Sequence, residues 1–144
     1  MSAIMLPISS VGTVAFTDPS KPIGLDGFVR LPVLTSPVSG AWDGSHLAVE
    51  PSGQGVPPQL LLIEAQSGGG LVGWTIVAPG DTTELELPDL RAVPKGGLVT
   101  GPVTFTVSAA TLEAFDYQQL RYRHISRFNW LAYAQDAFYS QLPP

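Results

Sequence analysis

Short apolar runs separated by turn residues constrain this chain more than any other feature. The clearest run, VTFTVSA from Val103 to Ala109, alternates apolar with polar side chains and so presents one apolar face as a strand. In the run TTELEL the leucines fall on one side, with Glu84 and Glu86 on the other. The chain has 15 glycines and 14 prolines, and this abundance of turn formers favours short strands with tight connections.

Further runs have the length of strands. They are Ile8 to Thr17, Phe28 to Leu34, His46 to Pro51, Gln59 to Gln66 and Leu71 to Ala78. The run QLLLIEAQ is almost continuously apolar, which indicates a buried central strand. The proline between Phe28 and Leu34 suits only an edge strand. In the last of these runs, Trp74, Ile76 and Ala78 would share one face.

Residues 129–141 fit two structures. Trp130, Tyr133 and Phe138 fall on one stripe of a helix that Ser126 would cap. The alternative is a final strand that closes a sheet. We favour the strand because the other runs indicate an all-β protein.

These runs predict an all-β fold, an antiparallel β-sandwich of about seven to eight strands. At 144 residues the chain is long enough to bury a hydrophobic core, and only 13% of its side chains are charged, which is few for solvated helices. We expect residues 28–144 to form the sandwich. Residues 1–27 are expected to be an N-terminal extension or an extra strand.

Four segments resemble strands of a fibronectin type III or related immunoglobulin-like domain. PVLTSPVSGA is similar to the first strand, HLAVEPS to the second, TTELELPDL to strand E and GPVTFTVSA to strand F. The resemblance runs from about Pro32 to Leu142. Val49 stands where the family has tryptophan, and Val103 where it has the corner tyrosine. The chain also resembles β-sandwich segments of uncharacterised bacterial surface lipoproteins, which implies a place outside the cytoplasm on a longer chain.

Composition and charge exclude several classes of function. The net charge of −5 argues against a general attraction to nucleic acid or to anionic membranes. Without cysteine the chain has no disulfide, thiolate zinc ligand or cysteine nucleophile. There is no apolar stretch of about 18 residues, so we expect no membrane insertion.

The start MSAIMLPISSVG lacks the basic region of a signal peptide. A fragment of a longer precursor and a chain that begins at its own start residue both fit this observation. We expect an extracellular, periplasmic or cell-surface location, with a cytoplasmic one as the alternative.

No motif for cofactor or metal chemistry stands in its required context. The run from Gly68 to Gly73 satisfies G-x-G-x-x-G, but WTIVAPG follows it, where a dinucleotide site needs a helix. His46 and His124 are isolated in sequence, which argues against a metal site. Glu84 and Glu86 indicate a solvated strand face rather than a calcium site or a hydrolytic pair. We therefore expect no cofactor, no metal and no enzyme activity.

The segment DYQQLRYRHISRF, in a loop from Leu112 to Phe128, is the best candidate for a binding site. Long ordered loops are uncommon unless they bind a partner or pack on their own side chains, and arginine and tyrosine often carry recognition. Trp42 joins the candidates because its ring suits sugar stacking, although a lone tryptophan more often plugs a core. The candidate residues of the segment are Tyr117, Arg121, Tyr122, Arg123, His124 and Arg127.

The alternative is that this loop only closes the sandwich. Asp116 would then pair with Arg121 or Arg123. Acidic residues offset most of the arginine charge in this segment, which argues against nucleic acid as a partner. The side chains that would cover the open end of the sandwich are Phe115, Leu120, Ile125 and Phe128, with Tyr117 and Tyr122 as half-buried lids.

The sequence thus predicts a non-catalytic β-sandwich module of a secreted or surface-anchored bacterial protein, acting as a structural or assembly scaffold. The alternative function is recognition of a protein or a glycan through loop 112–128. The expected partner is a protein, either the rest of the parent chain or another surface component, or else a glycan.

Overall fold

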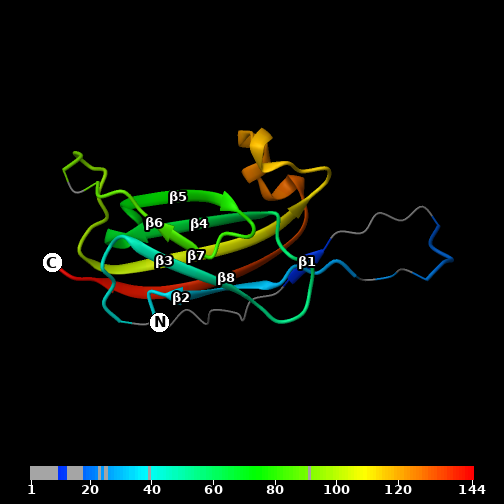
Figure 1. Ribbon diagram of the computed structural model, residues 1–144, viewed down its shortest axis with the longest axis horizontal. Coiled ribbons are helices and arrows are strands. Elements are labelled where there is room, and N and C mark those ends of the chain that lie inside the picture. The colour runs from blue at the N-terminus through cyan, green and yellow to red at the C-terminus, as the bar shows by residue number, and fades with distance from the viewer. Residues whose placement is uncertain (1–9, 13–17, 23, 25, 39, 91) are drawn as a thin grey trace.

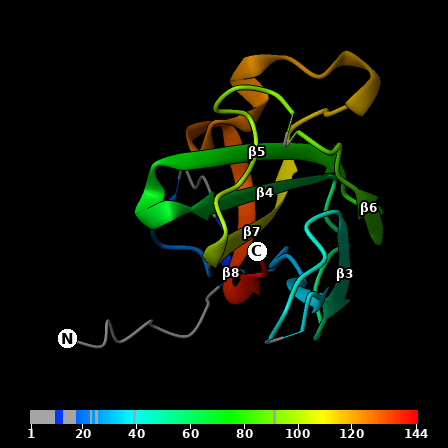
Figure 2. The ribbon, with the colours of Figure 1, turned by 90° about the vertical axis from the view of Figure 1, so that its left-hand side faces the viewer.

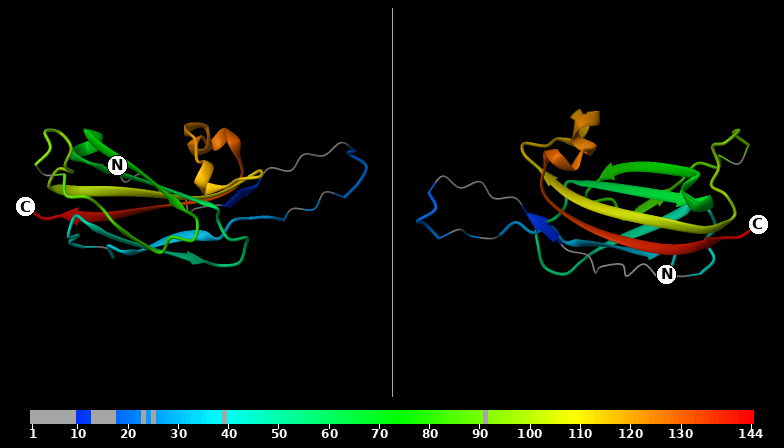
Figure 3. Two further views of the ribbon diagram at one scale, coloured as in Figure 1. Left: turned by 45° about the horizontal axis from the view of Figure 1, so that its top comes forward. Right: turned by 180° about the vertical axis from the view of Figure 1, so that it is seen from behind.

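The computed structural model describes residues 10–12, 18–22, 24, 26–38, 40–90 and 92–144. Within them the chain is mostly β, with two antiparallel sheets stacked as two layers (Figure 1, Figure 3). The strands are β1 (Ser10–Gly12), β2 (Leu31–Ser36), β3 (His46–Ser52), β4 (Leu60–Ser67), β5 (Val72–Pro79), β6 (Glu84–Glu86), β7 (Gly101–Leu112) and β8 (Trp130–Leu142).

The larger sheet has the strand order β1-β8-β7-β4-β5 and the smaller sheet the order β2-β3-β6. Two hairpins, β2 with β3 and β4 with β5, lie in different sheets. The chain changes sheet between β1 and β2, between β3 and β4, between β5 and β6, and again between β6 and β7. Figure 2 views the end that holds the C-terminus and separates β3 from the hairpin of β4 and β5.

The main core lies between the two sheets because each strand turns alternate side chains inward. Val103, Phe105 and Val107 of β7 are fully buried, as their alternation predicted. They share one apolar cluster with Leu47 and Val49 of β3, from the other sheet. Removal of this apolar surface from water is the main term that stabilises the stack.

Trp42 completes this core, which corrects the expectation of an exposed loop aromatic. Its side chain is 2% exposed, and its ring meets Phe105 edge to face with centroids 5.0 Å apart. Its Nε1 donates a hydrogen bond to the carbonyl oxygen of His46 at 2.7 Å. The loop before β3 therefore delivers an aromatic plug to the core, and Trp42 offers no face for sugar stacking.

Most of the predicted runs are strands, with shifted ends. β2 begins at Leu31 rather than Phe28, and its Pro32 sits on an edge strand as predicted, because only β3 pairs with β2 in the smaller sheet. β4 is central, with β5 and β7 on its two sides. β6 is short, and its Glu84 and Glu86 are exposed.

The N-terminal region contributes a short strand to the larger sheet. Val11 of β1 lies opposite Tyr133 of β8 in an antiparallel pair. Residues 8–9 and 13–17, the remainder of the strand predicted from Ile8 to Thr17, lie outside the described residues. Part of the region 1–27 is thus hydrogen-bonded to the last strand of the chain.

β8 is a strand, as favoured, and not the helix that its aromatic spacing also allowed. It pairs with β7 over the length of both strands. A bulge leaves Leu131 without an opposite residue in β7, so Trp130 and Tyr133 point to one face and their ring centroids lie 5.6 Å apart. The bulge thus brings two residues that are three positions apart to the same face of a strand, a spacing that is otherwise typical of a helix.

A second apolar cluster covers the outer face of the larger sheet. Leu60 and Leu62 of β4 belong to it and are buried, although the alternate residues of the same strand face the main core. They pack with Ala110, Leu112 and Trp130. β4 is therefore buried on both faces here, which explains its unbroken apolar sequence.

Candidate functional site

The segment 113–129, between β7 and β8, lies over the outer face of the larger sheet (Figure 1). Phe115, Tyr117, Leu120 and Ile125 pack against the second apolar cluster. The sequence analysis predicted that three of these side chains cover the open end of the sandwich. They cover a sheet face instead, because the outward leucines of β4 supply an apolar surface there.

Tyr117 ties the segment to the edge strand β5. Its hydroxyl donates a hydrogen bond to the carbonyl oxygen of Val77 at 3.0 Å. Beside it, Asp116 caps the 3-10 turn Tyr117–Gln119 by accepting a hydrogen bond from the backbone nitrogen of Gln118 at 2.9 Å. The half-buried tyrosine predicted here is confirmed, and its hydroxyl serves the fold.

His124 organises the next 3-10 turn, Tyr122–Ile125. Its Nδ1 accepts a hydrogen bond from the backbone nitrogen of Arg121 at 3.0 Å, and its carbonyl oxygen accepts one from Nε1 of Trp130 at 2.7 Å. A neutral imidazole has one acceptor nitrogen, so Nε2 carries the proton, and the 3.4 Å approach of Arg123 Nε to it is not a hydrogen bond. The ring supports the turn rather than serving as a free base.

The other side of the segment displays large side chains to solvent. Phe128 is 100% exposed and Tyr122 is 88% exposed. We call Arg121, Tyr122, Arg123, Arg127 and Phe128, all exposed, the outward set. Burying a side chain such as Phe128 is worth about 1.5–3 kcal/mol, so its exposure forgoes a sizeable stabilisation. Exposed aromatic residues among arginines are typical of a protein-binding surface.

Two members of the outward set differ from their predicted packing. Phe128 does not cover the sandwich, and Tyr122 is not a half-buried lid. From this part of the chain, Ile125 and Trp130 are the apolar side chains that pack in the second apolar cluster, and Phe128 and Tyr122 do not join them. The side-chain amide of Asn129 donates to the Arg123 carbonyl oxygen at 2.7 Å, which fixes the turn that leaves Phe128 outside.

The predicted ion pair of Asp116 with Arg121 or Arg123 is absent from the described residues. Asp116 instead accepts hydrogen bonds within its own turn. The guanidinium of Arg127 lies over the ring of Tyr133, 5.5 Å from its centroid. The positive charges of the outward set are therefore not neutralised by neighbouring carboxylates of the described chain.

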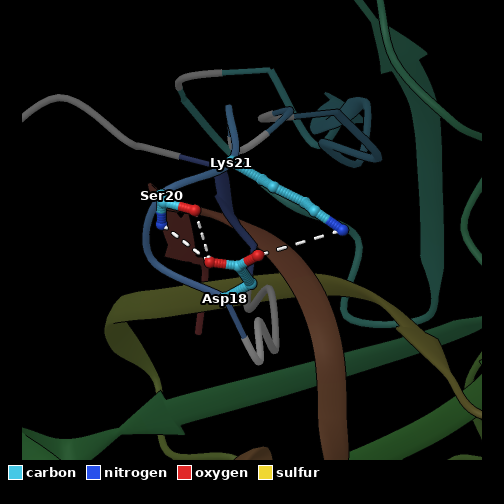
Figure 4. A network of polar contacts seen from close by, with 3 residues as sticks. All are labelled: Asp18, Ser20 and Lys21. Carbon is cyan, nitrogen blue, oxygen red and sulfur yellow. Dashed lines mark hydrogen bonds and ion pairs between the residues drawn. The ribbon is translucent and has the colours of Figure 1, made fainter.

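The ion pair that the described residues do contain lies in an exposed turn before β2. Lys21 Nζ is 3.9 Å from Asp18 Oδ2, and Asp18 Oδ1 accepts hydrogen bonds from the backbone nitrogen and hydroxyl of Ser20 (Figure 4). These hydrogen bonds from Ser20 lower the pKa of Asp18. Such an exposed pair contributes little to stability, and its residues shape the turn only.

An open groove of about 480 Å³ adjoins the packed side of the segment, between Phe115–Tyr117, Pro58–Gln59 and Pro79–Asp81. Gly80 is required in its wall, because a Cβ there would clash with the carbonyl oxygen of Pro58. Nothing in the sequence pattern predicts this groove, since it arises from the close approach of three segments that are far apart in sequence.

The described residues hold no group of three or more His, Cys, Asp or Glu side chains placed to bind a metal ion. His46 lies in β3, opposite Glu86, and His124 lies in the segment above the other sheet. Gly68–Gly70 form the 3-10 turn of the β4–β5 hairpin, and a strand follows them. The helix that a dinucleotide site requires is thus replaced by β5.

Comparisons with protein-family models, with curated proteins and with solved structures find no match to this chain. Among the described residues, the 3-10 turns are the only helical elements, and none has the length or hydropathy to cross a membrane. The function must therefore be inferred from the geometry of the molecule.

Proposed function

We propose that this protein is a non-catalytic β-sandwich module that binds a protein partner through the outward set. The sequence favoured a structural scaffold, with recognition as the alternative. The exposure of Phe128 and Tyr122 favours recognition, because a spacer gains nothing from large aromatic side chains held in water. This exposure, on a segment whose Phe115 and Tyr117 rings pack on the sheet, is the observation that carries the proposal.

The strand order supports a sandwich of the fibronectin type III kind. With β2 to β8 taken as strands A, B, C, C′, E, F and G, the sheets read A-B-E and C′-C-F-G, which resembles that arrangement. In the immunoglobulin constant type the fourth strand joins the A-B-E sheet instead. Trp42 fills the core in which Val49 stands at the family's tryptophan position.

The scaffold fixes the backbone that carries the outward set before a partner binds, so binding costs little additional conformational entropy. Side chains that must be immobilised lower affinity, and a backbone already fixed avoids part of that loss. The turns of the segment are fixed by Tyr117, His124 and Asn129. We infer that the segment acts as a preformed platform.

A photo-crosslinking amino acid tests this function. p-Benzoylphenylalanine replaces Phe128 in one variant and Phe28 in a control, which is 41% exposed but lies before β2 of the smaller sheet. Irradiated in cells of the source organism, the variant at position 128 should give discrete protein adducts that the control does not give.

A further substitution of Tyr122 by alanine in the position-128 variant should remove those adducts without changing the thermal unfolding temperature. Identical adducts from both positions, or none from either, contradict recognition by the outward set.

A further inference from the structure

An acidic groove lies at the opposite end of the larger sheet from the outward set. It holds about 630 Å³ between the turn at Asp43–Ser45, the residues that follow β6 and the end of β8. This volume falls in the range of about 300–1,000 Å³ that is typical of ligand-binding clefts. No pattern in the sequence predicts this groove, because its walls come from five separate segments.

The chemistry of the groove is the complement of the outward set. Its apolar wall includes Trp74 and Leu98, which are partly buried and pack against the main core. Carboxylates of Asp43, Glu86 and Asp89 line it, and no lysine or arginine does so among the described residues. Aromatic and positively charged side chains would find both apolar surface and opposite charge here.

The acid at the turn is held in its ionised form. Backbone hydrogen bonds from His46 and Ser45 lower the pKa of Asp43. The Asp43 Oδ1 atom accepts both bonds, at 2.9 and 2.8 Å. The carboxylate therefore stays ionised to a lower pH than an ordinary aspartate does.

The outward set and the groove of one molecule cannot meet. β7 begins at Gly101, next to Thr100 of the groove lining, and ends at Leu112, where the segment begins. Figure 1 shows the segment toward the end of the larger sheet opposite to the C-terminus, and residues 142–144 at the C-terminus line the groove. With a rise of about 3.3 Å per residue, this strand holds the two surfaces about 35–40 Å apart. β8 returns antiparallel along the same length. Contact between the two surfaces therefore requires two copies.

We propose that the partner of the outward set is a second copy of this chain, which receives it in the acidic groove. This inference rests on the proposed function, that the outward set binds a protein. Phe128 and Tyr122 would pack on the apolar wall, and the arginines would lie beside the carboxylates. A pair joined in this way still has one unused outward set and one unused groove, so association continues head to tail into open chains.

Salt should control this assembly. The charges involved lie at or near the surface, where screening at an ionic strength of about 0.15 M acts over about 8 Å. Sedimentation velocity of the purified chain at about 50 mM salt should show species that grow with protein concentration. At about 0.5 M salt the apparent association constant should fall at least about tenfold.

Two variants locate the surfaces. The loop variant carries Arg121→Ala, Arg123→Ala and Phe128→Ala, and the groove variant carries Glu86→Gln and Asp89→Asn. Each alone should be monomeric, and a mixture should form a one-to-one complex and nothing larger, because only one type of junction remains. A matched control, Glu50→Gln with Glu84→Gln, removes two exposed carboxylates outside the groove and should assemble like the wild type.

Wild-type protein that stays monomeric at about 1 mM and low salt overturns self-assembly, because even a weak contact populates oligomers there. Oligomers that persist in the groove variant overturn the groove as the receiving site. A monomeric wild type whose position-128 crosslinker still labels a different protein overturns self-assembly alone and leaves the proposed function standing. A wild type that forms no oligomers and gives no adduct from position 128 overturns both self-assembly and the proposed function.

Discussion

Trp42 stabilises the molecule by filling space beside Phe105 and by satisfying the carbonyl oxygen of His46. The substitution Trp42→Phe keeps an aromatic ring but removes the indole N–H and leaves a void. We expect a loss of about 1–3 kcal/mol in the free energy of unfolding. The thermal unfolding temperature should fall by about 3–9 °C. Calorimetry measures this, and an unchanged unfolding temperature contradicts the burial of the ring.

Asp136 carries a charge on the inner side of β8, opposite Val107. Partial burial raises its pKa above the ordinary value, although the backbone nitrogen of Ala137 donates a hydrogen bond to it. Protonation is therefore easier in the folded state than in the unfolded one. The ionised carboxylate costs stability above the folded pKa, and this cost disappears as the pH falls below the unfolded value of about 3.9.

The variant Asp136→Asn should consequently unfold at a higher temperature than the wild type at pH 7. The gain should stay below about 1 kcal/mol, because solvent still reaches the carboxylate. Thermal denaturation between about pH 7 and pH 3 should show the two unfolding temperatures converging in acid. A difference that is constant with pH, or a less stable variant at pH 7, contradicts the role of the charge.

At the scale of elements, the segment 113–129 covers the outer sheet face and is hydrogen-bonded to the edge strand β5 at one position. The Tyr117 hydroxyl donates a hydrogen bond to the carbonyl oxygen of Val77 in β5. Tyr117→Phe should cost about 0.5–1.5 kcal/mol, the usual value of one hydrogen bond. Tyr122→Phe, which removes the hydroxyl of an exposed ring, is the matched control and should cost nothing measurable. Equal losses in both variants, measured by urea denaturation, contradict this anchoring role.

The strands were predictable where the burial of one face or of both faces leaves a clear apolar pattern in the sequence. Alternation of apolar and polar residues indicates β7 and β6, and a continuous apolar run indicates β4. The same run in β4 contained the signal that something covers the outer sheet face. The covering element could not be identified from it, because the packing of the segment on the second apolar cluster joins residues far apart in sequence.

The candidate site was predictable in its place along the chain but not in its orientation. Arginine and tyrosine types marked the segment 112–128 correctly as unusual. Which aromatic rings turn inward depends on turn hydrogen bonds such as that of Asn129 to Arg123, and these follow from backbone geometry. Trp42 was wrongly predicted as a binding residue because its surrounding sequence indicates a loop. That local sequence gives no sign of the contact with Phe105, which is far away in the chain.

At the scale of the whole molecule, the two ends of the larger sheet differ in charge. The outward set gathers arginines at one end, while carboxylates line the groove at the other. The net charge of −5 would keep separate copies apart at long range, so any attraction between the two ends must act at short range. This polarity along one axis is what a unit that assembles in one direction requires.

The division of the segment into a side that packs and a side that is displayed is the claim on which the proposed function depends. Thermal denaturation of Phe115→Ala and Phe128→Ala, compared under identical conditions, tests it most directly. Phe115→Ala should lose about 1–3 kcal/mol because its ring packs on the second apolar cluster. Phe128→Ala should change stability by less than about 0.5 kcal/mol. Equal losses in the two variants would show that Phe128 packs in solution and would contradict its role in recognition.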